Sequence, residues 1–121
     1  MKIVRIMLMT IMVLGLVFSV AFAAADAAKG KALFNDPKAF GGEKACNACH
    51  PDGKGLEKAG AKKEFNIMGK TLKNLEEAVN FCIENAGKGK AIDPKSNKMM
   101  NLVAYIKSLD KKMEKGKTGG Y

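Results

Sequence analysis

The chain has 121 residues, enough for one small domain, and its 21 lysine and arginine residues outnumber 12 aspartate and glutamate residues. The lysines are spread through every segment and few aromatic residues accompany them, so the composition does not favour a nucleic-acid-binding surface. This distribution is typical of a solvated surface, which in its functional form would steer acidic partners or anionic substrates toward the protein. We expect no nucleic acid among the partners.

The N-terminus has the pattern of a secretory signal. A basic start at Lys2 and Arg5 precedes an almost wholly apolar run over residues 6–20 and small residues over 21–25, the pattern that a signal peptidase cleaves. Removing residues 1–23 takes two of the 21 basic residues away, which leaves 19 against 12 acidic ones and no membrane span. The alternative is an uncleaved membrane anchor, because about 20 apolar residues can cross a bilayer.

Residues 27–34 have the pattern of a short helix that ends at Asn35-Asp36-Pro37. Gly41 and Gly42 then form a flexible lead into a cysteine motif. After that motif, residues 51–55 contain proline and two glycines and must form a loop. We expect this loop to bring Leu56 back toward the cysteines.

Cys46, Cys49 and His50 form the most specific pattern in the chain. On a helical turn two cysteines three residues apart leave the same face, with Cβ atoms about 5–6 Å apart. Two such thiols can add to the two vinyl groups of one heme, and a histidine directly after them can ligate its iron. The motif therefore predicts one covalent heme c, with His50 as the proximal iron ligand. Because such hemes are attached outside the cytoplasm, we expect a periplasmic protein.

Other interpretations of the motif explain less. A zinc ribbon needs a second pair of ligands, but outside the motif the chain has one cysteine, Cys82, and no second histidine. A thioredoxin-like dithiol would lie beside a strand, and no alternating apolar run occurs near it. A structural disulfide between Cys46 and Cys49 would leave His50 without a role.

Two more helices are predicted after the motif. Asn74 and Glu77 form a capping-box-like start, and Gly87 follows the end of the apolar spacing. Ser96 can cap the last helix. The apolar stripe of the first consists of Leu75, Ala78, Val79, Cys82 and Ile83, and that of the second consists of Met99, Leu102, Val103, Ile106 and Leu109, with Tyr105 at its margin.

The apolar spacing stops at Asp110, so we expect residues 111–121 to be a disordered basic tail after a domain over residues 24–110. No strand pattern is found anywhere in the chain. The predicted fold is therefore all-α, with three to four short helices around one covalently attached heme.

Together these features resemble the small class I-like monoheme c-type cytochromes. Residues 30–34 are similar to the N-terminal helix of that family, residues 46–50 to its attachment motif and residues 102–109 to its C-terminal helix. The resemblance implies a small cytochrome c fold in which the two terminal helices cross near Gly30 and Tyr105, with thioether bonds to Cys46 and Cys49.

Two features depart from that family's pattern. Its members usually place a methionine ligand in the loop before the last helix, but residues 86–97 contain no methionine. They also often carry a Gly-Pro pair after the motif, whereas here Pro51 directly follows His50. The family's pattern therefore identifies no distal iron ligand in this chain.

Residues 78–83, followed by Gly89-Lys90 and then residues 100–109, more narrowly resemble thiosulfate dehydrogenases and related sulfur-oxidising cytochromes. In those proteins a helix-borne cysteine at the place of Cys82 ligates the heme iron. The resemblance implies Cys82 as the distal ligand.

The chain itself offers four candidates for this position, namely Cys82, Met68, Met99 and Met100. Met68 follows His50 by only 18 residues, and Met99 and Met100 lie inside a helix where a methionine is more often part of the core. Cys82 is the thiol that heme attachment leaves over, although a buried cysteine also serves as a small hydrophobic residue.

Three functions compete. The first is a periplasmic monoheme cytochrome that carries single electrons between redox partner proteins, since one heme in a small shell without a catalytic constellation moves one electron. The second is a heme subunit or relative of a thiosulfate-oxidising system, with Cys82 in contact with sulfur chemistry at the iron. The third is a heme-based binder of small molecules, which requires an open iron position. We expect an electron carrier rather than an enzyme.

Overall fold

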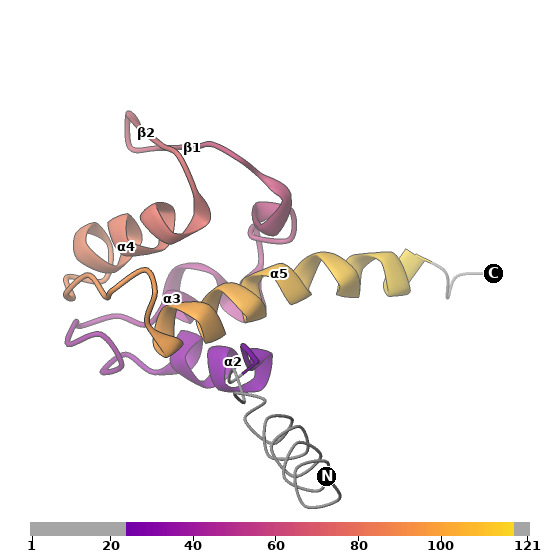
Figure 1. Cartoon of the computed structure of the whole chain (residues 1–121), viewed down its shortest axis with the longest axis horizontal. Coiled ribbons are helices and arrows are strands. Elements are labelled where there is room, and N and C mark those ends of the chain that lie inside the picture. Colours follow the sequence, from indigo (N-terminus) through magenta and orange to yellow (C-terminus); the bar gives the residue numbers. More distant parts are fainter. Residues whose placement is uncertain (1–23, 118–121) are drawn as a thin grey trace, which may run out of the picture.

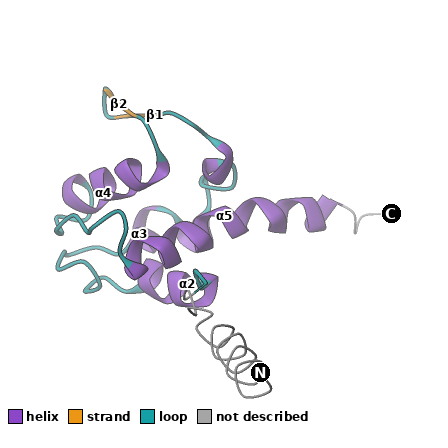
Figure 2. Ribbon diagram, viewed as in Figure 1, coloured by secondary structure: helices purple, strands orange, loops and turns teal. Residues whose placement is uncertain are grey.

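A computed structural model describes residues 24–117 of the chain. The elements in order are α2 (Ala27–Asn35), α3 (Cys46–Cys49), 3-10 turns at Pro51–Gly53 and Ala59–Ala61, β1 (Phe65–Ile67), β2 (Lys70–Leu72), α4 (Leu75–Asn85) and α5 (Asn97–Lys117). Figure 1 shows α5 as the long central helix, with α2 crossing it on one side and α4 and the hairpin on the other. Helices and loops make up almost the whole described chain (Figure 2).

The expected signal peptide over residues 1–23 lies outside the described residues. Within residues 24–117, no helix combines the length and the apolar character needed to span a bilayer.

The contact between α2 and α5 depends on Gly30. A Cβ atom built on Gly30 would overlap the carbonyl oxygen of Asn101 and lie 2.8 Å from the Cβ of Tyr105, so the helix backbones approach as closely as glycine allows. One turn later, the Phe34 ring packs edge-on against Tyr105, with ring centroids 5.1 Å apart. The crossing of the two terminal helices near Gly30 and Tyr105, which the family resemblance implies, is therefore present. Tyr105 is only 3% exposed, however, so it belongs to the core and not to its margin.

Side chains cap the helices where the chain turns into them. The Asp26 carboxylate accepts hydrogen bonds from the amides of Ala28 and Lys29 at the start of α2. At α4, the Asn74 side chain accepts from the amide of Glu77 at 2.8 Å, which confirms the predicted cap. Ser96 likewise accepts from the amide of Met99 at the start of α5.

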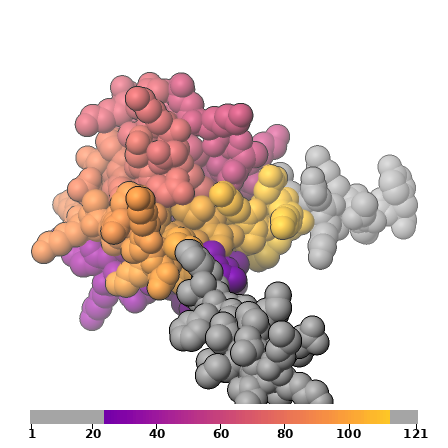
Figure 3. Space-filling view, in the orientation of Figure 1, coloured from indigo at the N-terminus to yellow at the C-terminus, as the bar shows by residue number. Residues whose placement is uncertain are grey.

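The core lies between α2, α4 and α5 and is wholly apolar apart from the Tyr105 hydroxyl. Its buried residues are Phe34, Phe40, Ala59, Phe65, Leu75, Ala78, Val79, Ile83, Met99, Leu102, Val103, Tyr105, Ile106 and Leu109. Both predicted stripes are buried, except that Cys82 is half-buried because it faces a cavity. In the space-filling view, α4 and the hairpin form the part of the molecule opposite α2 (Figure 3).

The structure corrects two further expectations. Residues 65–72 form an antiparallel hairpin in which Phe65 pairs with Leu72. Its strands are too short to show alternation in the sequence, and its turn places Met68 and Gly69 at positive φ, as in a type I′ turn. Helix α5 also continues to Lys117, so the expected disorder is wrong for residues 111–117, because lysine-rich segments are good helix formers even without an apolar stripe. Residues 118–121 lie outside the described chain.

Replacement of Gly30 by alanine tests the helix crossing. Alanine favours an isolated helix over glycine by about 1 kcal/mol, but here its methyl group would push α2 from α5, so we expect a net loss of about 1–3 kcal/mol in the free energy of unfolding. Urea titration followed by circular dichroism measures it. The exposed Ala32→Ser on the same helix should change stability by less than about 0.5 kcal/mol. A stabilised Gly30→Ala variant would contradict the crossing.

Candidate functional site

A cavity of about 130 Å³ lies between α3, the hairpin, α4 and the first half of α5. Its apolar walls are formed by Phe34, Phe40, Leu56, Ala59, Phe65, Ile67, Leu75, Ala78, Val79, Ile83, Leu102 and Ile106. Leu56 contributes to these walls, which confirms the prediction that the loop over residues 51–55 brings it back toward the cysteines. Because its walls are apolar, the cavity is suited to an apolar group.

The predicted motif lies on the wall of this cavity. Cys46 and Cys49 occupy the single turn of α3, and the amide of His50 closes that turn by donating to the carbonyl of Cys46 at 3.0 Å. Both cysteines and His50 line the cavity. All three cysteines of the chain, Cys82 included, are free thiols, so no structural disulfide joins Cys46 to Cys49 in this structure.

The thiols lie close enough to influence one another. Burial, followed by the charge of the neighbouring Cys82, raises the pKa of Cys46 to about 11. Burial and the charge of Cys49 also raise the pKa of Cys82. Cys82 reaches the cavity from α4, on a different element from the motif. Three sulfur atoms and one imidazole thus face a single apolar space.

The orientation of His50 is fixed by the loop that follows it. Its Nδ1 atom lies 3.0 Å from the carbonyl oxygen of Lys54. A carbonyl only accepts, so Nδ1 carries the proton and the Nε2 lone pair is free for a metal. The loop turns back because Asp52 adopts a positive φ and its amide donates to Asn47 at 2.8 Å. Although Pro51 directly follows His50 in place of the usual Gly-Pro pair, the carbonyl oxygen of Lys54 still accepts a hydrogen bond from the imidazole.

A protein-family model described as the SoxA/TsdA cytochrome c domain matches residues 29–114, well over half of the chain. The chain belongs to the SoxA/TsdA cytochrome c domain family. No curated protein and no solved structure matches it. Membership confirms the small cytochrome c fold and the relation to sulfur-oxidising cytochromes, and it means that the chain is a heme-carrying electron-transfer domain. The two thiols, the oriented imidazole and the apolar walls fit heme c.

The structure separates the four candidates for the distal position. In this cytochrome c domain Cys82 lines the cavity. Met68 lies at the tip of the hairpin and is 79% exposed, whereas Met99 is fully buried in the core at 0% exposure. Met100 is half-buried, and neither it nor Met99 contributes to the cavity wall.

Within the described residues, no three histidine, cysteine, aspartate or glutamate side chains gather in a group that could hold a metal ion by themselves.

Sequence reasoning missed several residues that shape the site. The Asn80 side-chain amide donates to the carbonyl of Ile92 and accepts from its amide, at 2.8 and 2.9 Å, and so fastens the loop after α4 to that helix. The sequence signal for this contact is an asparagine, Asn80, on the predicted helix two residues before the inward-facing Cys82. Phe40 and three glycines of the cavity wall are brought in by backbone turns that the sequence does not reveal.

Covalent attachment is testable on the protein exported from a host with heme-ligation machinery. Mass spectrometry of the denatured protein should show one heme on a chain that starts at Ala24 or Asp26, because two thiols on one turn each form a thioether bond. The double variant Cys46→Ser, Cys49→Ser should carry none. Recovery of the unaltered protein without heme, or with an intact Met1, would contradict the assignment or the predicted cleavage, respectively.

Proposed function

We propose that this protein is an exported monoheme c-type cytochrome that carries single electrons between redox partners in the periplasm. The observation that carries the proposal is the convergence of Cys46, Cys49 and His50 on one apolar cavity. Heme c, when bound, supplies an iron that cycles between the ferric and ferrous states. The signal-like residues 1–23 support export.

In this proposal the chain's own residues hold and tune the heme. Cys46 and Cys49 anchor it, and His50 presents Nε2 because Lys54 holds the proton on Nδ1. The apolar walls exclude water, which lowers the local dielectric and makes the potential sensitive to the charge of the ligands. Besides the motif, Cys82 and Lys44, the described residues around the cavity include no acid–base or nucleophilic group, which favours a carrier over an enzyme.

We further propose that Cys82 is the distal iron ligand. Cys82 lines the cavity from α4, and no methionine is among the lining residues. Heme attachment at the motif leaves its thiol free. A thiolate stabilises ferric iron and so lowers the reduction potential relative to histidine and methionine ligation. Family membership together with Cys82 also supports the alternative function, a heme subunit or relative of a thiosulfate-oxidising system.

The ligand is tested by the ferric absorption and paramagnetic resonance spectra. The wild type should show a low-spin thiolate signature that Cys82→Ala abolishes, while the reduction potential rises. Met68→Ala is the matched control and should leave both unchanged, because Met68 is 79% exposed. An unchanged Cys82→Ala spectrum, with loss of the native spectrum in Met100→Ala, would assign a methionine instead.

Two measurements on the same protein distinguish the remaining functions. Thiosulfate-dependent reduction of a dye acceptor would favour the sulfur-oxidising alternative over a simple carrier. Carbon monoxide binding to the ferrous protein, seen as a shift of its absorption spectrum, would indicate an open iron position and a binder of small molecules.

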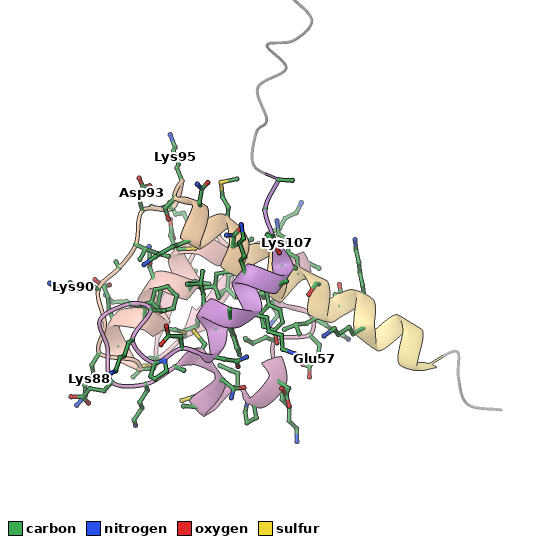
Figure 4. All side chains as sticks on the ribbon, turned by 90° about the horizontal axis from the view of Figure 1, so that it is seen from below. Glu57, Lys88, Lys90, Asp93, Lys95 and Lys107 are labelled. Atoms are coloured by element: carbon green, nitrogen blue, oxygen red, sulfur yellow. The ribbon has the colours of Figure 1, made fainter. Side chains whose placement is uncertain are left out.

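The partners we propose are redox proteins with acidic docking surfaces. Lys44 lies on the rim of the cavity, and Lys88 and Lys90 project outward from the loop after α4 (Figure 4). Glu43 pairs with Lys88 at 3.9 Å, but both side chains are 71% exposed, so this pair adds little and the positive charge predominates. Such a rim attracts anions at a rate that falls with salt.

Small inorganic oxidants test this surface without a natural partner. Oxidation of the ferrous protein by anionic ferricyanide should slow as ionic strength rises, and the triple variant Lys44→Gln, Lys88→Gln, Lys90→Gln should slow it about 3–10-fold at low salt. The control replaces three exposed lysines of α5, Lys107, Lys111 and Lys112, and should show a smaller effect. Equal salt dependence in both triple variants would show that the rim has no special role.

A further inference from the structure

Two loops meet at one edge of the cavity with their backbones in direct contact. A Cβ atom built on Gly42 would overlap the carbonyl oxygen of Gly87 and lie 3.0 Å from the amide nitrogen of Gly89. One built on Gly89 would lie 2.7 Å from the carbonyl oxygen of Phe40. We refer to Gly42, Gly87 and Gly89 as the glycine clasp. None of the three has a positive φ, so close approach and not backbone conformation explains glycine there.

Backbone hydrogen bonds hold the clasp closed. The amide of Glu43 donates to the carbonyl of Gly87 at 2.9 Å, and the amide of Lys90 donates to the carbonyl of Phe40 at 2.9 Å. Within the second loop, the amide of Gly89 donates to Ile83 of α4 at 2.8 Å. The two loops are thus paired on both sides of the contact, much like a short stretch of sheet.

The clasp connects the two sides of the cavity. Gly42 precedes Cys46 by four residues, and Gly87 follows Cys82 by five. All three clasp glycines line the cavity. Beyond the clasp, the two hydrogen bonds between Asn80 and Ile92 return the same loop to α4, so this loop is fixed at both ends.

We propose that the glycine clasp sets the separation between Cys82 and the heme-attachment turn, which makes Gly42, Gly87 and Gly89 positioning residues for the sixth iron ligand. The proposal rests on ligation by Cys82. A ligand must be held to within about 0.5 Å of its productive position. A methyl group inserted where backbone atoms lie 3.0 Å or less from a Cβ would force the loops apart, whereas ordinary contacts begin at 3.4 Å.

The test measures the sixth ligand in three single variants of the heme-loaded protein, Gly42→Ala, Gly89→Ala and Gly87→Ala. The ferric spectrum should lose low-spin thiolate signal, and added imidazole should bind about tenfold more tightly in Gly42→Ala, which corresponds to about 1.4 kcal/mol. The loss should be smaller in Gly89→Ala and smallest in Gly87→Ala, whose Cβ would meet Ile83 at 3.0 Å and Lys44 at 3.3 Å.

Two controls separate positioning from general damage. Gly41→Ala introduces strain at a φ of 69° with no atom within 4 Å of the new Cβ, and should keep the native spectrum. Gly60→Ala creates a tight contact at 2.9 Å from the Cα of Lys107 on α5, and should lower stability without changing the ligand. If Gly60→Ala loses the thiolate signal as Gly42→Ala does, the proposal is wrong.

The outcomes also distinguish this proposal from the one on which it rests. Wild-type spectra and imidazole affinity in Gly42→Ala and Gly87→Ala, alongside an altered Cys82→Ala spectrum, would overturn the clasp proposal alone. An unchanged Cys82→Ala spectrum would overturn both. If Gly42→Ala does not fold, Gly87→Ala decides, because its contacts can be relieved by shifts of a few tenths of an ångström.

Discussion

The close approach of α2 and α5 at Gly30 is the contact on which the rest of the structure depends. Because the helix backbones meet there, Phe34 is carried against Tyr105 on one side and reaches the cavity wall on the other. Leu102, about one turn before Tyr105 on α5, forms part of the same wall. A chain of this size buries a modest core. An apolar cofactor in the cavity would supply much of the missing centre.

In the proposed heme site, the distal ligand lies on a helix and not on a loop. The loop between α4 and α5 contains no methionine, yet it is held by Asn80 and by the glycine clasp. In the proposed arrangement this loop carries no ligand itself and instead supports the helix that does. A side chain on a packed helix is placed more accurately than one on a loop, so Cys82 gains its position from α4.

The sequence predicts a structural feature when neighbouring residues determine it, and fails to do so when the feature depends on contacts between distant segments. The motif at Cys46, the cap at Asn74 and the two apolar stripes are set by neighbouring residues, and the structure contains each of them. The hairpin escaped prediction because three-residue strands show no period, and the burial of Tyr105 depends on a helix distant in sequence. The glycine clasp also joins distant segments, so spacing along the chain cannot reveal it.

The hydrogen bond from the amide of Asp26 to the side chain of Asn101 joins residues 75 positions apart, and the contact at Gly30 spans a similar length. Contacts this distant are slow to form, because closing a long loop costs entropy before the contact is made. A chain that crosses a membrane N-terminus first therefore cannot close its core until α5 has emerged. In the proposed export, Cys46 and Cys49 would therefore stay accessible to heme attachment throughout that interval.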